Sequence, residues 1–140
     1  MSAECYICFF LLKMEFQAEV DFEFATIQLR KDGIVEFTQK PVVIDIVEVK
    51  ECHAAMDALQ VNQPFLLLVI VPLGASSTKE AREYASQKNI RNRIKAQAIV
   101  VDSLATRIMA NVYMKINRPQ QPIKVFSDKE AAIDWLVKKK

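Results

Sequence analysis

PFLLLVIVPLGASSTKEAREYASQK (64–88) is the stretch that decides the fold. Residues 65–71 form an unbroken apolar run of strand length, which is typical of a strand covered on both faces. We therefore expect this strand at the centre of a mainly parallel sheet. Pro72 and Gly74 end the strand. Ser77 and Glu80 have the spacing of a capping box, which predicts that a helix begins here.

Three hydroxyl side chains, Ser76, Ser77 and Thr78, follow this strand and are the candidate functional residues of the loop. Ligands of open parallel sheets bind at the carboxyl ends of the strands, and the free amides at a helix N-terminus attract anions. A phosphate on Ser76 or Thr78 would add about two negative charges here and change how a partner docks. Alternatively, the hydroxyls only cap the helix and the turn. The sequence leaves both interpretations open.

Strand-like and helical patterns alternate along the rest of the chain. After a predicted hairpin with strands at 22–29 and 34–38, helical stretches separate the strand-like runs at 65–71, 94–101 and 123–126. The order β-β-α-β-α-β-α-β-α predicts an α/β domain with a mixed, mainly parallel sheet of five strands and four helices. The helices begin at four capping sequences, at 45–48, 77–80, 102–103 and 127–130.

The handedness of the connections predicts a partner. If consecutive strands are neighbours and all crossovers share one hand, the helices lie on one face of the sheet. The other face of the strand at 65–71 then needs a cover, which the N-terminal segment or a second subunit could supply. We therefore expect a homodimer or another protein partner.

The length of the chain predicts one domain. Its 140 residues, of which 51% are hydrophobic, are enough for one buried core and too few for two comfortable domains. We expect a single domain at 22–140, preceded at 1–21 by an N-terminal extension that is partly disordered or artefactual. Two interpretations of residues 1–13 stay open: an added strand or helix packed on the domain, or an extension before a native start at Met14.

The first residues predict neither a membrane span nor export. The apolar run at 6–12 is far shorter than the roughly 20 residues that cross a bilayer. A secretory signal begins with basic residues and ends at a small-residue cleavage site, whereas Glu4 precedes this run and Lys13 follows it. We therefore expect a cytoplasmic protein.

Cys5 and Cys8 have the spacing of a redox pair or of half a zinc site. A redox pair follows a strand and begins a helix, and no strand is predicted before Cys5. A zinc site needs two more ligands, and the adjacent Cys52 and His53 would point about 100° apart on a helix. The sequence therefore favours free thiols in a reducing compartment, with no metal and no cofactor.

Neither nucleic-acid binding nor catalysis is predicted. The 19 basic and 17 acidic side chains leave a net charge of +2, and the basic residues do not form a stripe with interleaved aromatic residues. Arg91 and Arg93, in a polar connector at 89–93, are either solvated or part of a weak anion patch. The single histidine, His53, adjoins an apolar helical stripe, and we expect it at the boundary of the core. Because no GxSxG motif, phosphate-binding glycine loop or acid pair is present, we expect no enzyme.

A second candidate site lies on the helix predicted at 104–116. Met109, Tyr113 and Met114 could supply adaptable walls to a pocket between the sheet and this helix, where a small apolar or lipid-like ligand would bind. The apolar stripe of this helix comprises Leu104, Ile108, Val112, Tyr113 and Ile116, and we expect the last two in the core.

Four segments carry a family resemblance: LRKDGIVEF (29–37), STKEAREYAS (77–86), AIVVDSLATRIMANVYMKINRP (98–119) and IKVFSDKEAAIDWL (123–136). In order and spacing they resemble the uncharacterised bacterial families grouped as STAS-like or SpoIIAA-like, over residues 22–137. The resemblance implies the fold of the anti-sigma-factor antagonists, four turns of a β-α superhelix. Residues 1–13 have no place in that pattern.

The resemblance also implies a function. True antagonists carry a phosphorylated serine at the start of the helix after the central strand, in a context like Asp-Ser-Ser-Gly. Ser76, Ser77 and Thr78 occupy the matching location, without the flanking Asp and Gly. We therefore expect a non-enzymatic regulatory or protein-interaction module, controlled by phosphorylation at this loop. The alternative is a protein that binds a small apolar or lipid-like ligand.

Overall fold

A computed structural model of the chain describes residues 16–59, 64–117 and 120–140, without the side chains at positions 105, 109, 113, 116 and 117. The expectations for residues 1–13 and for the pair Cys5 and Cys8 lie outside the described residues. None of the described helices is long and apolar enough to cross a membrane.

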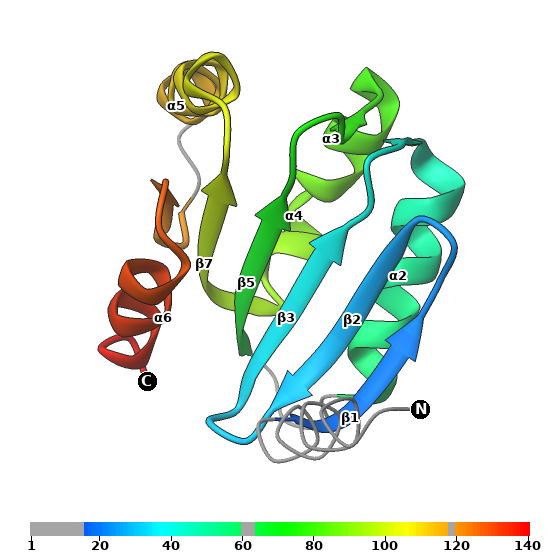
Figure 1. The fold of residues 1–140 in the computed structure, drawn as a ribbon, viewed down its shortest axis with the longest axis vertical. Helices are drawn as coiled ribbons and strands as arrows, with labels where there is room; N and C mark the ends of the chain where they lie inside the picture. Colours follow the sequence, from blue (N-terminus) through cyan, green and yellow to red (C-terminus); the bar gives the residue numbers. More distant parts are fainter. Residues whose placement is uncertain (1–15, 60–63, 118–119) are drawn as a thin grey trace, which may run out of the picture.

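Six strands form the central sheet, in the order β1-β2-β3-β5-β7-β8 (Figure 1). The first three strands pair antiparallel, and the pairs from β3 through β8 are parallel. The prediction that β5 lies inside the sheet is confirmed. The sheet has one strand more than predicted, because β1 forms within the segment expected as an extension. The strands are β1 (Phe16–Asp21), β2 (Ala25–Arg30), β3 (Ile34–Gln39), β5 (Phe65–Val71), β7 (Ile94–Val101) and β8 (Ile123–Phe126).

Three helices cover one face of this sheet. They are α2 (Ile46–Leu59), α3 (Lys79–Ala85) and the short α4 (Lys88–Arg91), which was not predicted as a separate helix. They lie in the crossovers from β3 to β5 and from β5 to β7, and right-handed crossovers that advance in one direction place their helices on one face. The core on this face includes Val35, Phe37, Val49, Cys52, Met56, Leu67 and Ala81.

The last helix, α6 (Lys129–Val137), covers the opposite face (Figure 1). Its buried Ala132 and Leu136 pack with Leu68 of β5 and Ala98 of β7. The expectation that all helices lie on one face was therefore wrong. α6 follows the final strand and connects no strand pair, so the handedness rule does not fix its side. An uncovered sheet face therefore gives no argument for a homodimer.

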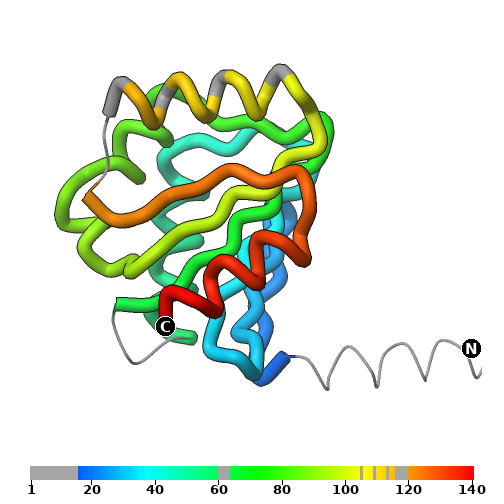
Figure 2. The backbone as a smooth tube through the Cα atoms, turned by 90° about the vertical axis from the view of Figure 1, so that its left-hand side faces the viewer, coloured from blue at the N-terminus to red at the C-terminus, as the bar shows by residue number. Residues whose placement is uncertain are grey.

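The helix α5 (Leu104–Asn117) lies along one edge of the molecule (Figure 2). Three residues of its predicted apolar stripe are exposed: Leu104 is 61% exposed, Ile108 54% and Val112 50%. The side chains of Tyr113 and Ile116, which we expected in the core, lie outside the described residues. A stripe shows which face of a helix is apolar, but here a cavity separates the inner side of α5 from the sheet.

Two helices begin one residue later than the capping sequences predicted. Thr78 rather than Ser77 caps α3, and Asp128 rather than Ser127 caps α6. Each cap accepts a hydrogen bond from the backbone amide three residues on, at 3.2 and 3.0 Å. The glutamate of each predicted box therefore stands at the second helical position, and a capping box requires it at the third.

Candidate functional site

A cavity of about 860 Å³, the main cavity, lies between the sheet and the helices α2 to α5. The volume falls in the range of roughly 300 to 1,000 Å³ that is typical of small-molecule sites. Strand residues form one wall of the main cavity, among them Leu67 and Val69 of β5 and Ile99 and Val101 of β7. They share a wall because alternate residues of a strand point to the same face of the sheet. The other walls include Val49, Cys52 and Met56 of α2, Ala81 and Ala85 of α3, and Thr106, Ala110 and Met114 of α5.

Small side chains on the helices keep the main cavity open. Ala81 and Ala85 of α3 and Ala110 of α5 face it, while the larger Leu104 and Ile108 of α5 lie on the solvent side.

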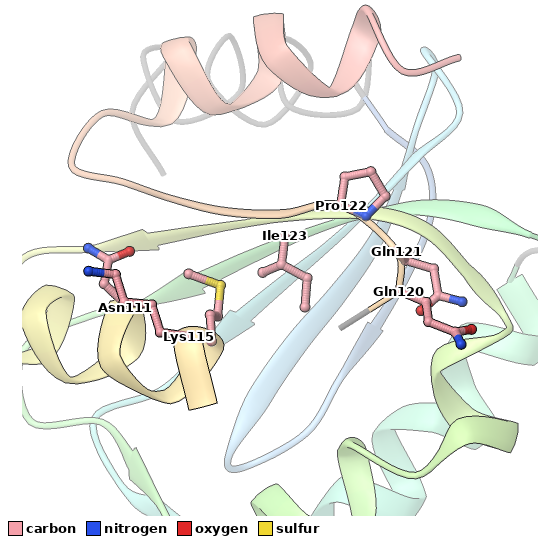
Figure 3. Close-up of a pocket in the computed structure, with 7 residues that line it drawn as sticks. Asn111, Lys115, Gln120, Gln121, Pro122 and Ile123 are labelled. Carbon is pink, nitrogen blue, oxygen red and sulfur yellow. The ribbon is translucent and has the colours of Figure 1, made fainter. Parts of the chain in front are cut away.

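A recess of about 660 Å³ adjoins the main cavity (Figure 3). It lies between α5 and the segment 120–123, and Figure 3 shows the side chain of Ile123, the first residue of β8, pointing into the space between them. The recess shares Met114, Gln120, Gln121 and Ile123 with the main cavity, so the two spaces are neighbours. Its remaining walls are Asn111, Lys115 and Pro122.

Polar side chains gather where α4 meets the first residues of β7 and β8. Nη1 of Arg91 donates a hydrogen bond of 2.5 Å to Oε1 of Gln97. Nε2 of Gln121 donates one of 3.2 Å to Oδ1 of Asn92. We name this group the polar corner: it comprises Lys88, Arg91, Asn92, Gln97, Gln120 and Gln121, all of which line the main cavity.

Cys52, on the α2 wall, is buried, and its thiol is protonated at neutral pH. Burial raises the pKa of its thiol to about 12, and the charges of Glu51 and Glu48 act in the same direction. A thiolate is the reactive form of cysteine, so this thiol stays unreactive at neutral pH. In the part of the chain that is described, no group of three or more His, Cys, Asp or Glu residues could hold a metal ion.

His53, next along α2, also lines the main cavity and packs edge to face against the ring of Tyr84, with 6.1 Å between centroids. Burial lowers the pKa of His53; the charge of Asp57 raises it, and the charges of Arg93 and Arg91 lower it. The imidazole is therefore neutral at pH 7, where it can both donate and accept a hydrogen bond.

The loop after β5 places two of the three predicted hydroxyl residues, Ser76 and Ser77, in a second, two-stranded sheet, and Thr78 follows them as the N-cap of α3. Gly74 makes the turn with a φ of 87°, and the amide of Ala75 donates a 3.1 Å hydrogen bond to the carbonyl of Pro72. The strand β6 (Ser76–Ser77) then pairs in parallel with β4 (Val43–Ile44). The backbone of these serines is therefore fixed.

The three hydroxyl residues differ in their surroundings. Ser76 is exposed, and Ser77 is half-buried. Thr78 uses its hydroxyl in folding, because Oγ1 accepts from the amide of Ala81 at 3.2 Å and donates to Oδ1 of Asp45 at 2.7 Å. Phosphorylation at this loop stays a prediction.

The three predicted pocket residues have two different outcomes. Met114 lines both the main cavity and the recess. The side chains of Met109 and Tyr113 lie outside the described residues. The sequence did not indicate the polar corner, although two signals were present: Gln97 interrupts the apolar run of its strand, and Arg91 lies in the connector considered as a weak anion patch.

Two comparisons relate the chain to known proteins, and no curated protein matches it. Its fold is similar to the crystal structure of an uncharacterized protein from the DUF3478 family with a SpoIIAA-like fold from Shewanella loihica PV-4. The TM-score is 0.63 at 16% identity, and the match covers 86% of this chain and 99% of that chain. The likeness confirms the predicted SpoIIAA-like α/β fold. Residues 27–140 match the family model described as "Domain of unknown function (DUF7793)", and the chain therefore belongs to that family.

Proposed function

We propose that this protein binds a small apolar ligand in the main cavity and does not catalyse a reaction on it. The observation that carries the proposal is a cavity of about 860 Å³ whose strand wall is mostly apolar. Each Å² of apolar surface that a ligand removes from water contributes about 25 cal/mol to its binding. The side chains of Leu67, Val69 and Ile99 supply such a surface between the sheet and α5.

The chemistry of the lining supports binding rather than catalysis. None of the lining residues that the structure describes is Asp or Glu, so these residues offer no acid pair. The thiol of Cys52, with its pKa raised to about 12, is not an activated nucleophile. His53 is the remaining titratable side chain near neutral pH, and it packs against the ring of Tyr84.

A matched pair of substitutions on α5 tests this proposal. Ala110→Phe places a ring in the main cavity, whereas Ile108→Phe changes a side chain that is 54% exposed on the same helix. The neutral fluorophore N-phenyl-1-naphthylamine, which brightens in apolar surroundings, reports binding. We expect wild type and Ile108→Phe to bind it and Ala110→Phe to bind at least about tenfold more weakly, a loss of roughly 1.4 kcal/mol. Equal binding by both variants, or none by wild type, would contradict the proposal.

A second function, docking of a protein partner under phosphate control, is supported by a different observation. Exposed apolar side chains lie around Ser76: Val43 pairs with it and is 64% exposed, and Leu73 is 77% exposed. Exposed apolar groups that cluster in this way are typical of interaction surfaces. A phosphate on Ser76 would add about two negative charges to this surface and change which partner it accepts.

Mass spectrometry of the protein from its native host tests this second function. We expect a phosphate mass increment that is lost in Ser76→Ala and retained in Thr78→Ser, because Thr78 uses its hydroxyl to cap α3. A modification that maps to Thr78 instead would contradict it.

A further inference from the structure

The outer side of α5 carries an exposed apolar ridge. Leu104, Ile108 and Val112 follow one another at intervals of four residues, and each side chain is at least half exposed. Side chains four residues apart lie on one side of a helix, so these three form a single row, which we name the outer ridge. Both views of the chain show α5 at the periphery of the molecule, so the outer ridge is open to a partner (Figure 1, Figure 2).

The two ends of the outer ridge carry opposite charges. Asp102 is exposed two residues before α5 begins, and Lys115 is exposed in the last turn of the helix. Lys115, which also borders the recess, lies about two turns after Ile108 and therefore on the ridge side of the helix. The other charged residue of α5, Arg107, is half-buried and lies about 100° around the helix from Ile108. The outer ridge is therefore apolar in the middle, acidic at one end and basic at the other.

We propose that two copies of this chain associate through their outer ridges, with the two α5 helices antiparallel about a two-fold axis at Ile108. A two-fold contact is self-complementary: when residue i of one copy meets residue j of the other, j also meets i. Leu104 and Val112 lie four residues on either side of Ile108, so each meets the other across the interface. Asp102 and Lys115 lie six and seven residues on either side, so opposite charges also meet.

The charges of the outer ridge favour a second copy as the partner, and they favour the antiparallel direction. Complementary charges favour the correct partner, and like charges that face each other disfavour a wrong one. In a parallel pair, Asp102 would face Asp102 and Lys115 would face Lys115, whereas the antiparallel pair joins unlike charges twice. The contact is small, because a single pair of helices lies below the roughly 1,200 Å² of stable interfaces. We therefore expect a reversible dimer with a Kd on the order of 100 µM.

A matched pair of substitutions tests the outer ridge, with sedimentation equilibrium of the purified full chain as the measurement. Ile108→Asp places two carboxylates at the two-fold axis, so we expect the Kd of the dimer to rise at least about tenfold. Val137→Asp is the control, because Val137 is an exposed apolar residue of α6, outside the ridge, and it should leave the Kd unchanged. Both positions are exposed, so neither substitution should unfold the chain, and circular dichroism checks this.

Two charge reversals test the antiparallel direction. Asp102→Lys and Lys115→Glu each place like charges together in the antiparallel pair, so each should raise the Kd by about threefold or more. An equimolar mixture of the two variants should dimerise more tightly than either variant alone, because both contacts of the mixed dimer join unlike charges again. In a parallel pair each reversal would only exchange one like-charge contact for another. The gain in the mixture should shrink as the salt concentration rises.

Each outcome decides a separate part of the proposal. A wild-type chain that stays monomeric up to about 1 mM would overturn the dimer. A dimer that Ile108→Asp does not weaken would use another surface and would overturn the role of the outer ridge. A dimer that Ile108→Asp weakens, but that neither charge reversal weakens, would overturn the antiparallel arrangement. None of these outcomes bears on the proposed ligand binding, because Ala110 lines the main cavity from the other side of α5.

Discussion

The hydroxyl of Thr78 donates a hydrogen bond of 2.7 Å to Oδ1 of Asp45, so the side chains that begin α3 and α2 are joined. Asp45 Oδ1 also accepts from the amide of Ile46 at 2.7 Å, and Oε2 of Glu48 accepts from the amide of Asp45 at 3.0 Å. The bond from Thr78, with the bond from Ile46, lowers the pKa of Asp45. These hydrogen bonds therefore connect the loop after β5 to the start of α2, at the edge of the sheet where β3 and β5 end.

Replacing Thr78 by valine should destabilise the fold. Thr78→Val keeps the shape of the side chain and removes both the cap of α3 and the bond to Asp45, so we expect the free energy of unfolding to fall by about 1 to 2 kcal/mol. Ser76→Ala is the matched control, because Ser76 is exposed, and it should change stability by less than about 0.5 kcal/mol. Urea unfolding measures both. If both variants lose the same free energy of unfolding, the cap by Thr78 does not stabilise the fold as we propose.

Glu36 links α6 to the sheet through a buried charge. Its side chain is 2% exposed, and it pairs with Lys129 at 2.6 Å and with Arg30 at 3.3 Å. Glu36→Gln removes the shared anion and leaves two cations close together, so we expect a loss of about 3 kcal/mol or more in the free energy of unfolding. The control is Glu19→Gln on the exposed side of β1, which should cost less than about 0.5 kcal/mol. Chemical denaturation that ranks the two variants equally would contradict a structural role for Glu36.

The sequence was sufficient to place β5, because a seven-residue apolar run bounded by Pro64 and Pro72 suits only a strand that is covered on both sides. It was not sufficient to place α6, since the handedness rule applies to crossovers and no strand follows this helix. The sequence was also not sufficient to predict which side of α5 faces the sheet. The apolar stripe that contains Ile108 identifies a face, and the small residues opposite, such as Ala110, lie toward the cavity instead.

The polar corner could not be read from the sequence for a different reason. Arg91 and Gln97 are close along the chain, but Gln121 reaches Asn92 only because β8 pairs with β7. Contacts of this kind depend on the register between strands rather than on local spacing. The hydroxyl residues, by contrast, are contiguous, and the location of Ser76 beside the end of β5 followed from the strand alone.

The pH dependence of stability should report the environment of His53. Burial lowers the pKa of His53 from the ordinary value of 6.5. The charge of Asp57 raises this pKa, and the charges of Arg93 and Arg91 lower it. Below pH 6.5 the unfolded chain therefore binds a proton that the folded chain resists, so the free energy of unfolding falls as the pH drops through this range. We expect the fall between about pH 7.5 and pH 5.5 to be smaller in His53→Gln, measured by urea unfolding at each pH. A wild-type stability that is flat across this range would contradict the lowered pKa.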